Sequence, residues 1–419
     1  MNTPMDTYLV GGAVRDALLG LPVTDRDWVV VGETPEAMQK AGYRPVGQDF
    51  PVFLHPETHE EYALARTERK SGPGYRGFVV DSDPSVTLEQ DLSRRDLTIN
   101  AIAMDENGEL VDPFDGRGDL EARRLRHVSA AFVEDPVRIL RVARFMARLA
   151  GHGFGVAEET RALMREMVAD GEVVHLVAER VWRELDGALA APVPRAAFET
   201  LRDSGALAVV LPELDALFGV PQPTDSHPGT DAGEHALLAL DAATALDGSV
   251  ETRLAALCHD LGKSTTPKAA WPHHEGHERR GAELVAALAE RLRIPRRVRD
   301  LAVLTARHHS ACHALDTLDA DALAGLLEAL DAIRKPERLA AFARACEADA
   351  RGRHGFAGRS YPQAARLLAF GDAFRGVDAG AVAKATADRA RVPAAIREAR
   401  TEALRRARAA LSDPRSPPL

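Results

Sequence analysis

Two aspartates near the amino terminus, Asp25 and Asp27, stand two residues apart in a segment that we expect to be extended. Side chains two apart on a strand point to the same side of it, so we expect both carboxylates on one face. Proteins bind Mg²⁺ through one or two carboxylates together with the phosphates of a substrate. The pair therefore predicts a Mg²⁺ site that acts on a phosphate compound.

A glycine pair, Gly11-Gly12, follows the apolar, strand-like residues 8–10. Because glycines have no Cβ, backbone N–H groups at the start of the next helix can approach an anion closely. Arg15 follows one helical turn after Gly12, as a fixed positive charge able to reach a phosphate. A phosphate cradle, a cation and a metal pair within twenty residues predict a nucleoside triphosphate site.

Residues 134–150, EDPVRILRVARFMARLA, predict a helix that carries charge on one side only. Asp135 is a good N-cap, and Pro136 suits the first helical position. A stripe facing the core is formed by Ile139, Leu140, Val142, Phe145, Met146 and Leu149. The opposite side carries Arg138, Arg141, Arg144 and Arg148. The residues by themselves require only a capped amphipathic helix with a basic face.

The run from Gly11 to Asp27 has the form GGxVRDxLLGxPxxDxD. This pattern resembles the head-domain signature of class II template-independent nucleotidyltransferases, the superfamily of CCA-adding enzymes and bacterial poly(A) polymerases. RRDLTINA at 94–101 resembles a second motif of that superfamily. The resemblance implies that Gly12, Arg15 and Arg95 bind the triphosphate. It also implies that Asp96 orients the arginines or caps the following helix.

The EDxxR motif, within residues 134–138, resembles the segment that these enzymes use as a protein template for the incoming base. A carboxylate accepts a hydrogen bond from the exocyclic amine of cytosine or adenine, whereas a guanidinium only donates. Uracil and guanine present a carbonyl and a ring N–H instead, so like groups would face each other. The resemblance thus implies that Asp135 and Arg138 select CTP and ATP, with Arg141 and Arg144 contacting base or phosphate.

Two further features of the resemblance concern acidic residues. ERVWRE at 179–184 resembles the next motif, in which Glu179, Arg180 and Glu184 would brace the template helix through salt bridges. Glu61 is a candidate third carboxylate, because related heads carry an acid on this strand, although a solvent-facing glutamate would look the same.

Nine of the fifteen histidines lie between residues 227 and 313, which indicates a metal site or a polar catalytic cleft. His259-Asp260, with His235 upstream, resembles the HD superfamily of metal-dependent phosphohydrolases. A His-Asp pair at a helix end and a histidine on a neighbouring helix can ligate one divalent ion. The resemblance implies a transition metal, with Ni²⁺ as one candidate.

The spacing does not determine the fourth HD ligand, for which Asp331 and Asp349 are both candidates. The remaining histidines could support the ligands, bind phosphate or be exposed: His274, His277, His308 and His309. An active domain would act as a 2′,3′-cyclic phosphodiesterase, 2′-nucleotidase and phosphatase. The alternative is an inactive HD fold retained for its helical packing.

Composition predicts a large protein of two to four domains, with 419 residues, 45% of them hydrophobic, and three cysteines that we expect to be reduced. The net charge of -10 argues against polyanion binding over the whole surface. Basic residues concentrate in 117–148 and 381–419, which could contact tRNA phosphates or form solvated helix faces. No apolar run of membrane-spanning length and no signal pattern occurs, so we expect a cytoplasmic protein without membrane contact.

The pattern of elements predicts an α+β chain. A nucleotidyltransferase head with a mixed sheet is expected over 1–117, with strands near 28–32, 50–56 and 60–66 and a long loop over 67–90. After Gly118 we expect helices only. The remaining predicted segments are a helical neck and body at 118–222, an HD domain at 223–333 that a linker at 218–233 precedes, and a helical tail at 334–419.

The order of the motifs resembles that of bacterial CCA-adding enzymes with an appended HD domain. The resemblance implies addition of CCA to tRNA from CTP and ATP, with Mg²⁺ on Asp25 and Asp27. Poly(A) polymerase is the alternative within the superfamily. A phosphohydrolase with an RNA-binding head is the alternative outside it, and the sequence leaves monomer and homodimer equally open.

Overall fold

The structure is a computed structural model that describes residues 5–46, 52–70, 78–223, 229–246 and 248–411. The chain divides into two compact units, Met1–Ala188 with Ala196–Val210 and Leu189–Arg195 with Leu211–Leu419. Parts of four predicted segments lie outside the described residues: 50–51 of a strand, 71–77 of the long loop, 224–228 of the linker and 412–419 of the helical tail.

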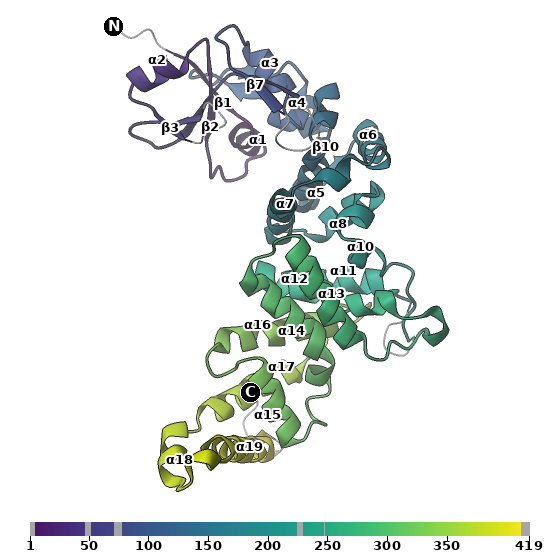
Figure 1. Cartoon of the computed structure of the whole chain (residues 1–419). Coiled ribbons are helices and arrows are strands. Elements are labelled where there is room, and N and C mark those ends of the chain that lie inside the picture. The colour runs from purple at the N-terminus through teal and green to yellow at the C-terminus, as the bar shows by residue number, and fades with distance from the viewer. Residues whose placement is uncertain (1–4, 47–51, 71–77, 224–228, 247, 412–419) are drawn as a thin grey trace. The chain divides into compact units, whose positions relative to one another are not determined.

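A seven-stranded mixed sheet forms the first part of the amino-terminal unit, in the order β3-β4-β5-β2-β1-β8-β9 (Figure 1). Its strands are β1 (Asp6–Val10), β2 (Asp27–Val31), β3 (Arg44–Val46), β4 (Val52–Leu54), β5 (Glu61–Leu64), β8 (Ala103–Met104) and β9 (Leu110–Val111). β2 runs parallel to β5, and the other neighbouring strands are antiparallel. The predicted mixed sheet is confirmed.

Alternation along β2 gives the sheet two buried faces. Val29 belongs to one apolar cluster, which includes Leu92 of α3 (Leu88–Ser93). Val30 belongs to another, which includes Met38 of α2 (Pro35–Lys40). Neighbouring residues of a strand point to opposite faces, so this one strand contributes to both cores. Thr34 caps α2 by accepting a hydrogen bond from the Ala37 N–H at 3.2 Å.

Residues 67–90 contain regular structure where the sequence predicted a loop. β6 (Thr67–Lys70) and β7 (Phe78–Asp81) form an antiparallel pair, with Thr67 opposite Asp81 and Lys70 opposite Phe78. The loop prediction was therefore wrong for these two strands. Backbone hydrogen bonds between two segments make such a ladder, and the side-chain alternation that marks a half-buried strand is not required for it.

Helices follow the sheet in the amino-terminal unit. After α1 (Gly12–Leu18) and α4 (Gly116–Glu121) in the head come α5 (Val137–Leu149), α6 (Glu158–Ala169), α7 (Ala178–Ala190), α8 (Arg195–Asp203) and α9 (Ala206–Val210). The expectation of no strand beyond Gly118 was wrong at one place, where β10 (Arg124–Leu125) pairs with β11 (Gly155–Val156). Two residues are too few to produce a periodic signal.

The described part of the carboxy-terminal unit is helical, as predicted (Figure 1). Its helices are α10 (Pro212–Asp215), α11 (Ala232–Ala245), α12 (Val250–Cys258), α13 (His277–Arg291), α14 (Arg296–His313), α15 (Ala320–Ala329), α16 (Pro336–Arg351), α17 (Pro362–Arg375), α18 (Ala379–Ala385) and α19 (Val392–Leu411). Small side chains, among them Ala239, Ala256 and Ala348, let α11, α12 and α16 pack closely. No helix in the described ranges is both long and apolar enough to cross a membrane.

The described ends of the predicted linker are packed into the carboxy-terminal unit. Val220, Gln222 and Ala232 are buried. The Gln222 side chain accepts a hydrogen bond from Lys263 Nζ at 2.7 Å, and Asp231 caps α11 by accepting from the Glu234 N–H at 2.8 Å. The described residues on both sides of 224–228 are thus held by burial and by side-chain hydrogen bonds.

Candidate active sites

A cavity of about 580 Å³ opens in the amino-terminal unit. Its lining includes every residue that the sequence assigned to metal or nucleotide in the head and the template helix: Gly12, Arg15, Asp25, Asp27, Arg95, Asp135, Arg138, Arg141 and Arg144. These residues come from α1, from the start of β2 and the turn before it, from the segment after α3 and from α5 with the turn before it. The fold therefore gathers four separate motifs at one place.

The two carboxylates Asp25 and Asp27 are both exposed in this cavity. Asp27 is the first residue of β2, opposite Val10 of β1 and Glu61 of β5, whereas Asp25 lies just before the strand. The pKa of Asp27 is raised above its ordinary value. Partial burial of the carboxylate is the main cause and the charge of Asp25 adds to it, whereas Arg95 opposes the shift. Glu61 is also exposed and lines the cavity, so it is placed where a third carboxylate would be. Three hard oxygen donors in one cavity fit a divalent cation.

The turn between β1 and α1 requires glycine at Gly11. Its φ is +68°, a conformation that side chains disfavour, and a Cβ there would lie 3.2 Å from Arg95 Nη1. Arg95 in turn donates a hydrogen bond to Asp91 at 3.1 Å. The glycine therefore lets the backbone pass close to an arginine that Asp91 holds in place.

Arg15 is buried at the cavity wall and points inward. Its guanidinium donates to Asn100 Oδ1 at 2.6 Å and forms an ion pair with Asp16 at 2.8 Å. Burial lowers the pKa of Arg15, and Asp16 opposes that shift. The sequence predicted a cation one turn after the glycines, and the structure adds that two side chains hold it.

Asp96 performs the first of the two tasks that the sequence left as alternatives. It orients an arginine by accepting from Arg141 Nε at 2.7 Å. It does not cap the short helix Thr98–Asn100, whose N-cap is Leu97, although it accepts from the Leu97 N–H at 2.8 Å. Burial raises the pKa of Asp96, but Arg141 and the hydrogen bonds outweigh it and hold that pKa well below its ordinary value. The carboxylate is therefore charged at neutral pH.

The EDxxR motif shows a partner that the sequence did not assign to it. Arg180 of α7 donates to both Asp135 oxygens, at 3.1 and 2.6 Å. Arg138 is buried and donates to the backbone carbonyls of Ala131 at 2.8 Å and Arg94 at 2.5 Å. Arg180 also lines the cavity. The ERxxxE motif was the available signal, but spacing alone could not say which acid Arg180 meets.

Glu184 of α7 supports the basic side of α5. This buried carboxylate accepts from Arg144 Nε at 2.6 Å and lies 3.9 Å from Arg141 Nη1. Arg148 pairs with Asp16 at 2.6 Å. The salt bridges expected of Arg180 and Glu184 are therefore present, and the basic side of α5 faces the cavity.

We expect Glu184→Gln to destabilise the amino-terminal unit by about 2 kcal/mol. A charge-assisted hydrogen bond contributes about 1.5–3 kcal/mol, and the change leaves Arg144 without its carboxylate. Urea denaturation followed by tryptophan fluorescence measures the effect. Arg183→Gln is the control on the same helix, because Arg183 is exposed and a change there should stay within about 0.5 kcal/mol. Equal destabilisation by both variants would contradict the assignment.

A second group of side chains converges in the carboxy-terminal unit. His235 of α11, His259 at the end of α12 and Asp349 of α16 are all buried. His235 Nε2 lies 3.2 Å from His259 Nε2 and 3.1 Å from Asp349 Oδ1, and His259 Nε2 lies 3.5 Å from the same oxygen. The two histidines predicted as ligands are thus together.

The sequence offered Asp331 and Asp349 as candidates for the fourth HD ligand. Asp349 is the one that lies beside His235 and His259. Asp331 lies after α15, where it accepts a hydrogen bond from Arg334 at 2.8 Å. Asp260 lies beside His259, with its Oδ2 3.1 Å from His259 Nε2. The arrangement collects two histidines and two carboxylates, a nitrogen and oxygen donor set that suits a divalent transition metal.

Burial and the carboxylates of Asp260 and Asp349 shift the pKa values of His235 and His259. Burial lowers the pKa of His235. Burial also opposes protonation of His259, but Asp260 and Asp349 outweigh it and raise the pKa of His259 to about 9. Lys263 Nζ already donates to Asp260 Oδ2 at 2.5 Å, and a bound cation would take the place of the His259 proton as a further positive charge beside the two carboxylates. The residues therefore fit a metal ion.

The histidines with open roles separate into two kinds. His277 and His309 lie beside Asp260, with Nε2 atoms 3.3 and 3.6 Å from its Oδ1. His274 is bonded through Nε2 to the Pro221 carbonyl at 2.9 Å, and His308 is half-buried on α14. His277 and His309 therefore belong to the site.

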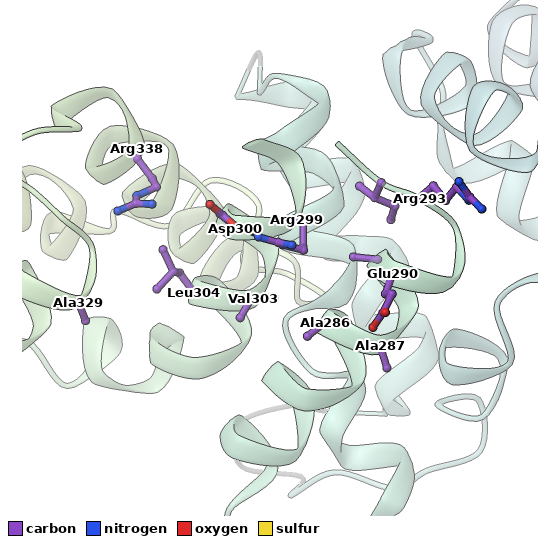
Figure 2. A pocket seen from close by; sticks show the side chains of 12 residues that line it. Ala286, Ala287, Glu290, Arg293, Arg299, Asp300, Val303, Leu304, Ala329 and Arg338 are labelled. Carbon is purple, nitrogen blue, oxygen red and sulfur yellow. Dashed lines mark hydrogen bonds and ion pairs between the residues drawn. The ribbon is translucent and has the colours of Figure 1, made fainter. Parts of the chain in front are cut away.

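A larger cavity, of about 920 Å³, lies elsewhere in the carboxy-terminal unit, between α13, α14 and α16 (Figure 2). It is lined by alanines and by charged residues such as Arg299 and Asp300, which are bonded to each other at 2.7 Å. None of the candidate site residues belongs to its lining. The larger of these two cavities is therefore not the one that collects the candidate site residues.

Comparison with protein families matches three parts of the chain. Residues 7–126 match the Poly A polymerase head domain. Residues 153–218 match the probable RNA and SrmB-binding site of polymerase A, and residues 232–342 match the HD domain. The fold and the sites thus define a template-independent nucleotidyltransferase followed by an HD domain.

Whole-chain relatives specify the family further. The chain is 63% identical over 365 residues to the multifunctional CCA protein of Thioalkalivibrio sulfidiphilus, covering 87% of this chain and 89% of the relative. It is 57% identical over 409 residues to that of Laribacter hongkongensis, covering 97% and 100%. The chain belongs to the family of multifunctional CCA proteins.

Solved structures agree on the fold. The Bacillus stearothermophilus CCA-adding enzyme in complex with CTP matches with a TM-score of 0.63 at 23% identity, over 95% of this chain and 89% of that one. The Thermotoga maritima CCA-adding enzyme complexed with tRNA matches with a TM-score of 0.60 at 19% identity, over 97% and 92%.

Proposed function

We propose that this chain adds CCA to the 3′ end of tRNA from CTP and ATP, without a nucleic-acid template. The observation that carries the proposal is one cavity in which the carboxylates Asp25 and Asp27, the arginines of five segments and the EDxxR motif meet. In the reaction the tRNA 3′-hydroxyl attacks the α-phosphate of the nucleotide, the bond to the β-phosphate breaks and pyrophosphate leaves.

Asp25 and Asp27 would hold Mg²⁺, with Glu61 beside them on β5. A bound Mg²⁺ polarises the phosphate and favours ionisation of the attacking hydroxyl. Arg15 and Arg95, together with the backbone at Gly12, would bind the triphosphate. Because Asp16 and Asp91 already hold these arginines, little side-chain entropy is lost when the nucleotide binds.

Asp135 and Arg138 would select the base. The carboxylate accepts from the amine of cytosine or adenine, and a guanidinium donates to the ring acceptor. Arg180 holds Asp135 by a two-point hydrogen bond, so we assign it to positioning that carboxylate. Arg141 and Arg144, which Asp96 and Glu184 orient, would contact base or phosphate.

We expect Asp135→Ala to lower kcat/KM for CTP and ATP about 10- to 100-fold. A hydrogen bond to a charged group contributes about 1.5–3 kcal/mol, and about 1.4 kcal/mol corresponds to tenfold. The kcat/KM for UTP and GTP should fall less, because their bases do not form the hydrogen bond to Asp135. The ratio of kcat/KM for CTP or ATP to kcat/KM for UTP or GTP should therefore decrease. Single-nucleotide addition kinetics measure all four substrates.

Arg180→Gln should also decrease the ratio of kcat/KM for CTP or ATP to kcat/KM for UTP or GTP. The decrease should be smaller than in Asp135→Ala, because the Asp135 carboxylate is retained. Arg183→Gln on the same helix is the matched control, since Arg183 is exposed. Unchanged discrimination in Arg180→Gln would show that this arginine only stabilises the fold.

The whole proposal is tested by incubating the purified chain with tRNA that lacks its 3′ CCA, Mg²⁺ and each nucleotide in turn. Ordered addition of two C and one A is the expected result. Long A tracts would support the poly(A) polymerase alternative. Absence of addition, with phosphate esters still cleaved, would leave the phosphohydrolase as the main activity.

We also propose a metal-dependent phosphohydrolase in the HD domain, because buried histidines and carboxylates converge there. His235, His259, Asp260 and Asp349 would hold a transition metal, with Ni²⁺ as the first ion to test. A bound metal ion supplies a hydroxide nucleophile near neutral pH. Substrates of the class of 2′,3′-cyclic nucleotides, 2′-nucleotides and phosphate monoesters test the activity.

We propose that the chain consists of four segments. They are the head at 1–117, the neck and body at 118–222, the HD domain at 223–333 and the tail at 334–419. We also propose a cytoplasmic location, where a tRNA substrate is available, and sedimentation analysis would distinguish monomer from homodimer.

A further inference from the structure

We infer that Phe145 is a positioning residue of the amino-terminal cavity, where its ring holds arginines that bind the nucleotide. The inference rests on the proposed function for the identity of the ligand, a nucleoside triphosphate. The sequence indicated this phenylalanine only as one member of the apolar stripe of α5. In the structure it lines the cavity, with 5% of the residue exposed.

Three guanidinium groups lie over this one ring. The Cζ atoms of Arg15 and Arg144 are each 5.2 Å from the ring centroid, and the Cζ atom of Arg141 is 5.8 Å from it. A guanidinium within about 6 Å of an aromatic centroid is attracted by the negative charge of the ring face. The ring of Phe145 therefore attracts all three cations.

The ring connects two helices of the amino-terminal unit. Arg141, Arg144 and Phe145 belong to α5, and Arg141 is placed beside the ring because residues four apart share a helix face. Arg15 belongs to α1. Phe145 thus joins the arginine that we assign to the triphosphate with the two that we assign to base or phosphate.

A chain of hydrogen bonds joins two of the same arginines by a second route. Asn100 Oδ1 accepts from Arg15 Nη1 at 2.6 Å, and Asn100 Nδ2 donates to Asp96 Oδ1 at 2.9 Å. The other oxygen of Asp96 accepts from Arg141 Nε at 2.7 Å. Side chains that share such a network are fixed together, so a change at the ring should displace more than one arginine.

The ring differs from the carboxylates around these arginines because it carries no net charge. Asp16, Asp96 and Glu184 each form an ion pair with one of the three arginines, at 2.8, 2.7 and 2.6 Å. Each carboxylate therefore cancels positive charge. An aromatic ring attracts a cation through its quadrupole and adds no negative charge. Phe145 can hold the arginines together while their charge remains available to the phosphates of a nucleotide.

Burial strengthens the contact between Phe145 and Arg15. Arg15 is 2% exposed, and a buried charge needs partners to replace the water that it has lost. Cation–π attraction is larger in a desolvated site than at an exposed one. We therefore expect the triphosphate-binding arginine to depend most on the ring.

Fluorination of the Phe145 ring tests the inference in the full-length chain. Fluorine withdraws charge from the ring face and weakens its attraction for cations, with little change in ring size. Phenylalanine with one, two or three ring fluorines is incorporated at position 145, and the dissociation constant of CTP is measured by titration calorimetry with Mg²⁺. The constant should increase with each fluorine, to about 5-fold with three and about 10-fold in Phe145→Leu.

The same fluorine series at Phe154 is the matched control. Phe154 is also 5% exposed, and the Cζ atom of Arg123 lies 5.5 Å from its ring centroid. It does not line the cavity. Fluorination there weakens a cation–π contact of similar geometry and should leave the dissociation constant of CTP unchanged.

Circular dichroism shows whether each protein folds, and the fluorinated rings provide the test even if Phe145→Leu does not fold. A constant affinity for CTP along the Phe145 series would overturn the inference, because the ring would then act by its volume alone. Equal weakening along the Phe154 series would overturn it as a general effect on the fold. A chain that binds CTP, with the expected losses along the Phe145 series, but does not extend tRNA would keep the inference and overturn the proposed CCA addition.

Discussion

Asp27→Asn is expected to reduce nucleotide addition at least about 1,000-fold. A catalytic metal contributes several kcal/mol to transition-state stabilisation, and about 4 kcal/mol corresponds to 1,000-fold. Asp27 is the first residue of β2 and is paired with Val10 of β1 and Glu61 of β5. The sheet therefore holds its carboxylate at the cavity. The rate of CMP incorporation into tRNA that lacks CCA measures the effect.

Asp6→Asn is the control for this change. Asp6 lies at the far end of the neighbouring β1 strand, is exposed and does not line the cavity. Addition by this variant should stay near that of the unmodified chain. If Asp27→Asn retained a tenth of the activity or more, the metal pair would have to lie elsewhere.

Asp349→Asn is expected to lower phosphohydrolase activity at least about 100-fold and to leave CCA addition unchanged. The variant replaces an anionic ligand, against which His235 and His313 lie at 3.1 and 2.6 Å, with a neutral amide. Loss of the charge weakens both the metal and the orientation of these rings. Hydrolysis of a 2′,3′-cyclic nucleotide at saturating metal ion, together with metal content, measures the effect.

Asp331→Asn is the decisive comparison, because the sequence offered Asp331 and Asp349 as equal candidates. Asp331 pairs with Arg334 after α15, so its substitution should leave hydrolysis and metal content unaffected. Equal losses in the two variants would indicate a general effect on the helical domain. CCA addition monitors the other compact unit in the same samples.

Local patterns in the sequence predicted the parts of the fold that depend on neighbouring residues. The strands near 28–32 and 60–66 and the helix within 134–150 are of this kind. The β6–β7 pair was missed because a ladder between strands is not a property of either strand alone. The same reasoning explains the short β10–β11 pair.

Motif spacing and the family resemblance named the candidate residues from the sequence alone. Gly12, Asp25, Asp27 and the EDxxR motif are of this kind, and the structure gathers them in one cavity. Two local details were wrong: Asp25 lies before β2 and not on it, and Asp135 is not the N-cap of α5, which begins at Val137 after Pro136.

The tertiary structure decided the partners. Arg180 meets Asp135, Asp349 rather than Asp331 joins His235, and Asp260 faces two pairs of histidines. Asp349 lies 114 residues from His235 in the chain. Only the packing of α11 against α16, through small side chains such as Ala239 and Ala348, brings them within hydrogen-bonding distance. Packing of helices depends on the shapes of both faces at once, which no single stretch of sequence contains.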